Sequence, residues 1–300
     1  MHRNLLSILS HVCHGYVGNR ACVFPLQCCG WDVDTVHTTN YLNHPGHGTF
    51  QGEKNDGRTI STIIEGLKKL FDLREYYNVV LVGYCPSAEV MTAVYEELEP
   101  IYKTKDRKEG PVFVVDPVLG DNGRLYVPEE VVQVHIDFLK RGLVDLTTPN
   151  QFEMELLTDT KFLSWNDVKS ACYKFYDTYK VPDFVILSVL IDEQMYSVGF
   201  SASTETVFYV PIQEIRCRFS GCGDIFTALL TNEFYSNGRV LSPQVLTLVV
   251  DKLHRILLTS FREERARLGR DPDVIHDINL VRLRDLFERS FGGDLEVKYL

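Results

Sequence analysis

Apolar runs alternate with segments of helical spacing through most of the chain. Continuous apolar or β-branched runs are typical of buried strands, whereas apolar residues three and four positions apart are typical of amphipathic helices. Such runs predict strands at residues 4–10, 32–39, 78–82, 112–115 and 184–187. Helical spacing predicts helices at residues 19–29, 57–71 and 88–102. This βαβα order favours an α/β fold with a mostly parallel central sheet and helices on both faces.

The pattern changes after Ser188. Residues 195–201 and 206–210 predict two consecutive strands joined by a short polar turn, which would add a small antiparallel part to the sheet. From Asp224 onward the spacing is mostly helical, and it predicts helices at residues 224–235, 243–265 and 278–289.

The composition is that of an ordinary globular protein, with 300 residues, of which 45% are hydrophobic and 24% charged. The charged stretch 103–109 predicts a solvated surface loop. No repeat or linker divides the chain, so we expect a single domain over residues 1–300. The formal net charge of −10 argues against a nucleic-acid partner, because such a partner requires a basic face.

Signals for membrane insertion or secretion are missing from the sequence. The apolar run near the N-terminus is too short for a signal peptide, and no run reaches the ~18 apolar residues of a membrane span. The eight cysteines include no C-x-x-C pair, which disfavours a structural zinc site and favours a reducing compartment. We therefore expect no membrane partner and a cytoplasmic location, with the nucleus as an additional compartment.

Four polar clusters follow predicted strands. In an open parallel sheet, ligands bind at the carboxyl ends of the strands, so these clusters are expected to meet at one edge. Each of them alone also fits an ordinary turn or helix cap. The clusters are Ser10 with His11, Gly83 with Tyr84, Asp116 through Asp121, and Thr148 through Asn150 with Glu153.

The segment Gly221-Cys222-Gly223-Asp224 stands directly before an apolar helical run. Two glycines let the backbone approach a ligand closely, and the free N–H groups of a helix start favour an anion. An acid placed inside an anion site suits acceptance of a proton from an attacking hydroxyl. Asp is also common in the first turn of any helix, so the segment alone equally fits a plain helix start.

Two further segments carry carboxylates that suit a cation. Asp121 is a candidate ligand for Mg²⁺ near a polyphosphate, because Mg²⁺ prefers carboxylates, water and substrate oxygens. Asp116, at a strand end, suits a monovalent ion or the nucleotide region. Asn150 and Glu153 have the spacing of a capping box, and Glu153 could also hold a metal through water.

The glycine-containing N-terminal region does not match a dinucleotide fingerprint, because Gly15 and Gly18 have the wrong spacing. The polar, glycine-rich loop 43–48 suits a lid over a small ligand. Its residues His44 and His47 also fit a plain surface loop. They lack a supporting carboxylate in the sequence around them, so a zinc site is not expected there.

These segments together resemble the pyridoxal kinases, which are members of the ribokinase-like superfamily. The resemblance runs from Ser7 to about Leu230. The matching segments are SHVCHGYVGNRACVFPLQ, WDVD, NHPGHG, GY, VDPVLGD, YVPE, TPNQFEMELL and GCGDIF. Such a collinear set is far more specific than any one motif. The helical C-terminal fifth matches only in character.

The resemblance implies transfer of the ATP γ-phosphate to the 5′-hydroxymethyl group of pyridoxal, pyridoxine or pyridoxamine. It implies Mg²⁺, K⁺ as an additional ion, and a homodimer. It assigns Asp224 as the catalytic base, with Gly221, Cys222 and Gly223 as the anion hole. It assigns the nucleotide contacts, besides Gly221 and Gly223, to Asn150 and Ser188. Asp121 and Glu153 match the Mg²⁺ region, and Asp116 and Thr148 the monovalent cation. The positions that match the vitamin side are Ser10, Thr39, Tyr41, Tyr84 and Tyr126.

The departures from the family pattern lie mainly around the vitamin. Pro45 and His47 replace a Thr and an aromatic residue in the lid, and Tyr41 replaces a Phe. Cys222 replaces a Thr in the anion hole and, at a helix start, suggests an oxidation-sensitive thiol of lowered pKa. Two alternatives therefore stay open. One is a kinase for another small heteroaromatic or sugar alcohol, and the other is a weakly active paralogue that binds ATP or B6 vitamers.

Overall fold

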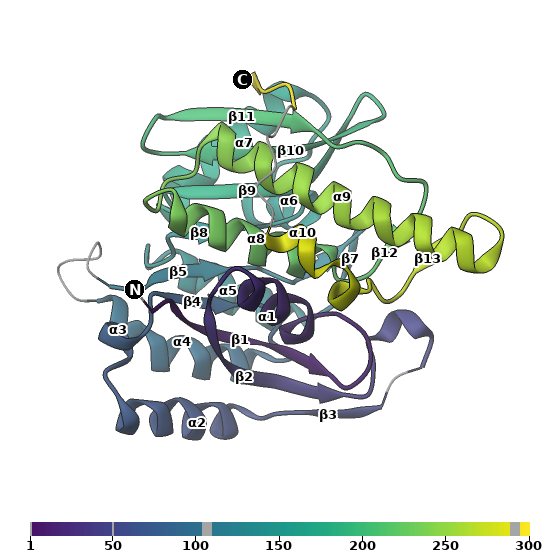
Figure 1. The fold of residues 1–300 in the computed structure, drawn as a ribbon. Coiled ribbons are helices and arrows are strands. Elements are labelled where there is room, and N and C mark those ends of the chain that lie inside the picture. The colour runs from purple at the N-terminus through teal and green to yellow at the C-terminus, as the bar shows by residue number, and fades with distance from the viewer. Residues whose placement is uncertain (1, 50, 104–109, 289–294) are drawn as a thin grey trace.

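The computed structural model describes residues 2–49, 51–103, 110–288 and 295–300. Within them, the chain forms a ten-stranded sheet in the order β14-β11-β10-β9-β8-β5-β4-β1-β2-β3 (Figure 1). Two small two-stranded sheets flank it, formed by β6 (Gly120–Asp121) with β7 (Arg124–Leu125) and by β12 (Arg218–Phe219) with β13 (Val274–Ile275). The strands of the large sheet are β1 (Asn4–Val12), β2 (Asp32–Tyr41), β3 (Gly52–Lys54), β4 (Val79–Val82), β5 (Val112–Val115), β8 (Leu146–Thr147), β9 (Asp183–Ile191), β10 (Gln194–Ser201), β11 (Thr206–Pro211) and β14 (Lys298–Tyr299).

The centre of the sheet is parallel from β2 through β1, β4, β5 and β8 to β9. Every residue of β4 and β5 is buried, as their uninterrupted apolar sequences require of strands covered on both faces. Antiparallel strands extend both edges, with β3 beside β2 and with β10, β11 and β14 beyond β9. The predicted mostly parallel sheet with a small antiparallel addition is confirmed, and β3 adds a second antiparallel edge that the sequence did not reveal.

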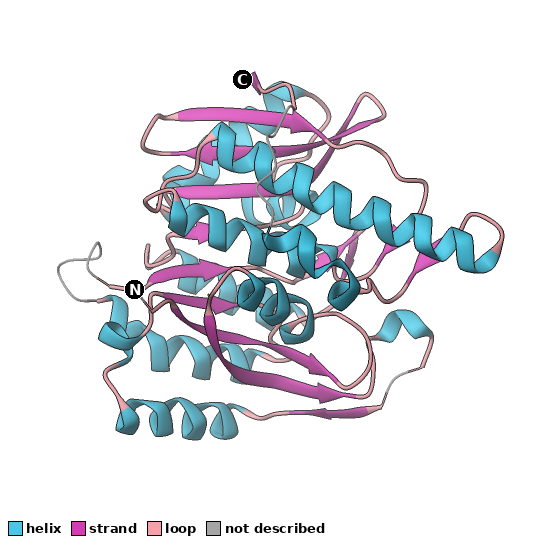
Figure 2. Cartoon of the chain, in the orientation of Figure 1, coloured by secondary structure: helices cyan, strands magenta, loops and turns pink. Residues whose placement is uncertain are grey.

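Helices cover both faces of the sheet (Figure 2). Alternate residues of a strand point to opposite faces, so Leu6 and Ile8 of β1 pack in one core and Leu5 and Leu9 in the other. The first core lies mainly under α2, α4, α5 and α7, and the second under α1, α8 and α9. No described helix is both long and apolar enough to cross a membrane. The helices are α1 (Asn19–Cys28), α2 (Gly57–Leu70), α3 (Leu73–Tyr76), α4 (Ala88–Tyr102), α5 (Glu129–Leu139), α6 (Gln151–Thr158), α7 (Trp165–Tyr179), α8 (Cys222–Ser236), α9 (Pro243–Leu268) and α10 (Arg284–Glu288), with the short 3-10 helices η1 (Pro45–His47) and η3 (Leu280–Leu283).

The C-terminal region departs most from the predicted elements. The expected helix over residues 278–289 is instead η3 followed by the five-residue α10, and Arg289 lies outside the described residues. Leu280 and Leu283 are both buried, a spacing of three that a 3-10 turn presents to one side. The strands β13 and β14 also interrupt the stretch predicted as helical. Of the predicted charged loop 103–109, residues 104–109 lie outside the described residues.

Candidate active site

Parallel neighbours β1, β4, β5 and β8 end at one edge of the sheet, and the start of α8 meets them there. Thr227 of α8 donates from Oγ1 to Oδ2 of Asp116, which follows β5, over 3.2 Å. The Thr227 hydroxyl is also 2.9 Å from that of Thr148, which follows β8. Ser10 and His11 lie within β1 rather than after it, because β1 continues to Val12 through an irregularity in its pairing with β2. The predicted convergence of the clusters is otherwise confirmed.

The start of α8 depends on Gly221. Its φ of 82° lies in the left-handed region, and a Cβ there would collide with the backbone oxygen of Tyr16. Cys222, Gly223 and Asp224 form the first turn of α8, where N–H groups have no acceptor inside the helix. The backbone of the loop after β1 therefore lies so close to this turn that no side chain fits between them at Gly221.

Asp224 is held from the opposite side by the backbone of Gly18. The N–H of Gly18 donates to Oδ2 of Asp224 over 2.9 Å. Burial raises the pKa of Asp224 to about 6, and the Gly18 hydrogen bond opposes that rise. A carboxylate with such a pKa is suited to accept a proton near neutral pH. The contact of Gly18 with Asp224 was not predicted from the sequence; a positive φ of 54° and the close approach of Ser10 are what require glycine there.

Asp116 is a buried carboxyl group beside the half-buried Asp224. Burial and repulsion from Asp224 together raise its pKa to about 8, and hydrogen bonds from Thr227 and Thr148 oppose the rise. The buried Asp116, which accepts from hydroxyl groups, and the half-buried Asp224, which accepts from the Gly18 N–H, together form a site of negative potential. Such a set of oxygen atoms suits a hard cation.

Glu153 and Asn150 form the predicted capping box at the start of α6. Glu153 also accepts hydrogen bonds from the N–H groups of Leu119 (2.8 Å) and Gly120 (3.3 Å), while its other oxygen accepts from Asn150 N (2.9 Å). Asn150 in turn donates from its side chain to the Gly120 carbonyl over 2.7 Å. Through these bonds, Asn150 and Glu153 hold residues 119–120, which precede Asp121, against the start of α6.

Asp121 lies half-buried on β6 at the rim of this edge, where its carboxylate accepts from the N–H of Asn122 over 2.8 Å. Tyr126 is 58% exposed nearby, with its N–H bonded to the Leu119 carbonyl. Burial raises the pKa of Tyr126 to about 12, and the charges of Asp121 and Glu153 raise it too. The charges of Asp121 and Glu153 thus act on Tyr126, which places the three residues in one neighbourhood.

The positions expected on the vitamin side gather at the ends of β1, β2 and β4. Thr39 is fully buried, and its hydroxyl has no hydrogen-bond partner among the described residues. Burial raises the pKa of Tyr84 to about 12, and the neighbouring Tyr41 contributes. Ser10 contacts Gly18 so closely that only a glycine fits opposite it. Ser188 lies on β9, one residue after Leu187, whose N–H donates to the Pro149 carbonyl.

Cys222 corrects an expectation drawn from helix polarity. Burial raises the pKa of its thiol to about 11, and Sγ donates to the Phe219 carbonyl over 3.4 Å. The favourable field of the helix start is smaller than the cost of burying a thiolate beside Asp224. Cys222 is therefore not an activated thiol.

Comparison with known proteins decides the family. No model of a protein family matches the chain. A pyridoxal kinase from Arabidopsis thaliana is 35% identical, over 89% of this chain and 85% of the relative. The chain belongs to the pyridoxal kinase family. A second member, from Ovis aries, is 30% identical over 88% of each chain.

Solved pyridoxal kinase structures have the same fold. The Leishmania donovani pyridoxal kinase in complex with ADP and pyridoxamine superposes with a TM-score of 0.85, at 29% identity and over 99% of each chain. Its complex with ADP and pyridoxine gives a TM-score of 0.84. The pyridoxal kinase fold, and with it membership of the ribokinase-like superfamily, is confirmed.

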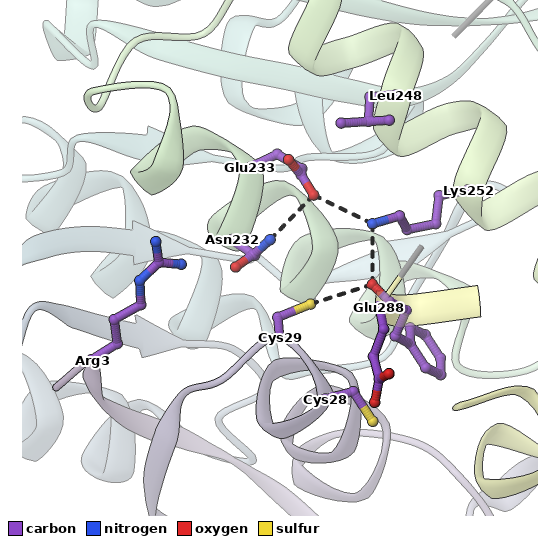
Figure 3. A pocket seen from close by; sticks show the side chains of 9 residues that line it. Arg3, Cys28, Cys29, Asn232, Glu233, Leu248, Lys252 and Glu288 are labelled. Carbon is purple, nitrogen blue, oxygen red and sulfur yellow. Dashed lines mark hydrogen bonds and ion pairs between the residues drawn. The ribbon is translucent and has the colours of Figure 1, made fainter. Parts of the chain in front are cut away.

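The structure also contains a cavity that is separate from the candidate active site. It measures about 340 Å³ and lies among α1, α8, α9 and α10 (Figure 3). None of the residues predicted for the active site lines it. Its lining residues are Arg3, Cys28, Cys29, Asn232, Glu233, Leu248, Lys252, Phe287 and Glu288.

Proposed function

We propose that this chain catalyses ATP-dependent phosphorylation of the 5′-hydroxymethyl group of pyridoxal, pyridoxine and pyridoxamine. One observation carries the proposal. Asp224, a half-buried carboxylate whose pKa is raised to about 6, stands in the first turn of α8 and is aligned by Gly18. Membership of the pyridoxal kinase family supports the choice of substrates.

In this proposal Asp224 accepts the proton of the substrate hydroxyl. The Gly18 hydrogen bond takes up one lone pair of Oδ2 and leaves Oδ1 able to receive that proton. The first-turn N–H groups at Cys222 and Gly223 then face the transferring phosphoryl group, whose negative charge they stabilise. The chemistry thus needs positioning and charge compensation rather than a covalent intermediate.

A divalent cation fits the same edge of the sheet. The available groups are oxygens, and a positive ion would relieve the repulsion between the carboxyl groups of the buried Asp116 and the half-buried Asp224. Asp121 and, through water, Glu153 would hold Mg²⁺, while Asp116 and Thr148 suit a monovalent ion such as K⁺. When bound with ATP, Mg²⁺ would neutralise charge on the phosphate oxygens.

The vitamin side is supplied by the ends of β1, β2 and β4. The unpartnered hydroxyl of Thr39 is available for a polar atom of the substrate. Ser10 lies beside Gly18, and hence beside the base, and Tyr41 and Tyr84 add aromatic surface. Tyr126 closes the rim from the Asp121 side. Asn150 and Ser188, on the β8 and β9 side, are the proposed nucleotide contacts.

The test is phosphorylation of the three B6 vitamers by the purified protein with ATP and Mg²⁺, run beside Asp224→Ala. Product from the wild type and a loss of ~10²–10⁴-fold in the variant would support the proposal. A hydroxymethylpyrimidine serves as the competing substrate, and preference for it would overturn the choice of vitamin. Saturable ATP binding with no product from any substrate would point to a non-catalytic paralogue.

We further propose that the chain is a cytoplasmic homodimer. The family resemblance supports the dimer, and eight free cysteines, with the pKa of Cys22 and Cys172 raised by burial, support a reducing compartment. Light scattering on the purified protein and cell fractionation test the two parts separately.

A further inference from the structure

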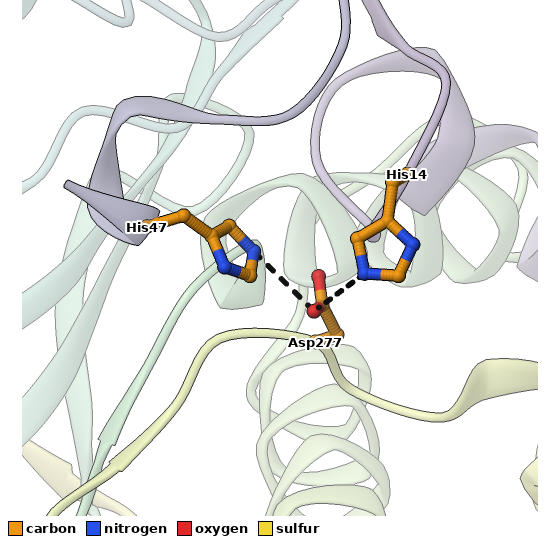
Figure 4. A group of neighbouring side chains, drawn as sticks. All are labelled: His14, His47 and Asp277. Carbon is orange, nitrogen blue, oxygen red and sulfur yellow. Dashed lines mark ion pairs between the residues drawn. The ribbon is translucent and has the colours of Figure 1, made fainter. Parts of the chain in front are cut away.

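Two histidines and one carboxylate from three separate segments gather next to the lid. His14 comes from the loop after β1, His47 from η1 in the lid, and Asp277 follows β13 (Figure 4). His14 Nε2 lies 3.4 Å and His47 Nε2 3.3 Å from Oδ2 of Asp277. One candidate ligand atom from each of the three residues lies within 4.8 Å of those of the other two. Figure 4 shows the two rings facing the carboxylate from opposite sides.

The sequence around the lid histidines carries no supporting carboxylate, but the folded chain brings one to His47 from a distant segment. Asp277 supplies one from 230 residues further along the chain than His47. No pattern around residues 43–48 could reveal it, because the contact exists only after β13 has paired with β12.

The spacing of these atoms favours a bound ion over plain ion pairs. A charge-assisted N–H···O⁻ hydrogen bond measures ~2.7–2.9 Å, shorter than both distances between His14 or His47 and Asp277. Zn–N and Zn–O bonds of ~2.0–2.1 Å at tetrahedral angles separate neighbouring ligand atoms by ~3.3 Å. The observed 3.3 and 3.4 Å match that separation for the two pairs that include Asp277, and the third pair lies within 4.8 Å.

The surroundings hold the cluster in place without an ion. His44 accepts from the N–H of Gly46 at Nδ1 over 3.1 Å, so its Nε2 carries the proton and donates to the His276 carbonyl over 3.0 Å. This ring joins the lid to the segment that carries Asp277. Gly15 completes the arrangement, since a Cβ at that position would collide with Oδ1 of Asp277.

We propose that His14 Nε2, His47 Nε2 and Asp277 Oδ2 bind a divalent cation of the zinc class, and that this ion cross-links the lid to the body of the protein. Two imidazoles with one carboxylate suit zinc and its transition-metal neighbours, whereas Mg²⁺ and Ca²⁺ prefer oxygen ligands alone. The His14 side chain is 70% exposed, which leaves an entry path and a position for water. This site is separate from the carboxylates assigned to Mg²⁺. Its effect on the lid rests on the proposed function and on the expectation that loop 43–48 is a lid over the substrate.

The first experiment measures Zn²⁺ binding to the full chain without nucleotide, by calorimetry, and Co²⁺ binding by its tetrahedral visible absorption. We expect one ion per chain. Loss of outer-shell partners alone costs ~10–100-fold in affinity, so His14→Gln and Asp277→Asn should each weaken binding by more than ~100-fold. His14 is exposed, so its variant should fold normally, and circular dichroism verifies this for both.

Two control variants locate the ion. His254→Gln removes a histidine of α9 whose charged neighbours are Asp251, Arg255 and Arg262, and it should leave zinc affinity unchanged. Asp121→Asn alters the proposed Mg²⁺ region and should also leave it unchanged. Zinc binding that Asp121→Asn abolishes and His14→Gln preserves would overturn the proposal. Absence of zinc binding by the wild type would overturn it as well.

The lid is followed by hydrogen–deuterium exchange of the peptide that covers residues 44–49. Zinc should slow exchange there in the wild type and have no effect in His14→Gln. Unchanged exchange in a zinc-loaded wild type would overturn the cross-link. Both measurements work without turnover, so their failure is distinguishable from failure of the kinase assay.

Discussion

The N–H of Gly18 donates to Oδ2 of Asp224 over 2.9 Å, across 206 residues of sequence. This contact joins the loop after β1, which reaches the vitamin side, to the first turn of α8. It fixes the carboxylate relative to Ser10, whose atoms crowd Gly18. Backbone approach therefore joins the proposed base to the proposed vitamin side, and several expected outcomes depend on it.

The rate should fall at low pH because Asp224 must be ionised to accept a proton. Burial raises its pKa to about 6, so the ionised fraction decreases as pH falls through about 6. We expect kcat/KM to fall about tenfold per pH unit below that value. The apparent pKa of this decrease should be the same for all three vitamers, because the titrating group is on the enzyme. An apparent pKa near the ordinary value of an aspartate, or one that changes with the vitamer, would contradict this assignment.

Gly18→Ala should lower both stability and kcat. Gly18 has a φ of 54°, and a Cβ would collide with the carbonyl oxygen of Ser10, so the N–H would move away from Asp224. Gly30 is the matched control, since its φ of 85° is also left-handed but nothing lies within 4 Å of a Cβ. We expect Gly30→Ala to cost ~1 kcal/mol and Gly18→Ala at least ~2 kcal/mol in urea unfolding. Equal costs and equal kcat values would show that the close approach is unimportant.

Glu153→Gln should destabilise the protein even without metal. The Glu153 carboxylate accepts from three backbone N–H groups, and a Gln amide would turn one donor toward another donor. We expect a loss of ~1–3 kcal/mol in the free energy of unfolding, measured by urea denaturation in the presence of a chelator. An unchanged free energy would falsify the positioning role and leave only a role at the metal.

Glu233→Gln should lower the free energy of unfolding, because Glu233 is the charged partner of the buried Lys252. Lys252 is 4% exposed, its Nζ lies 3.4 Å from Oε1 of Glu233, and it donates to the Phe287 carbonyl over 3.3 Å (Figure 3). Removing the carboxylate leaves a buried ammonium without its charged partner, at a cost of ~3 kcal/mol.

The double variant Lys252→Met/Glu233→Gln tests this reason, since it removes both charges. It should be more stable than Glu233→Gln alone, as measured by thermal and urea unfolding. Additive losses from Lys252→Met and Glu233→Gln would argue against coupling between the two charges.

Much of the fold could be predicted because its signals are local. The uninterrupted apolar runs of β4 and β5 require burial on both faces, and Asn150 with Glu153 has the spacing of a capping box that the structure contains. A continuous helix over residues 278–289 was predicted where the structure has η3 and α10. The spacing of Leu280 and Leu283 fits both an α-helix and a 3-10 helix, so the sequence pattern could not distinguish them. Neither α5 nor α7 was predicted, although each is amphipathic and is packed against the same core.

By itself, the sequence determined which residue types stand at the ends of the strands, since polar groups after apolar runs meet at one edge of a parallel sheet. It also placed Asp224 in the first turn of a helix. Only the tertiary structure decided the electrostatics, because a pKa depends on burial and on charges from distant segments. Burial raised the pKa of Cys222, where helix polarity alone predicted a decrease. The partners Gly18 and Asp277 were likewise decided by chain packing, since each meets its counterpart across more than two hundred residues.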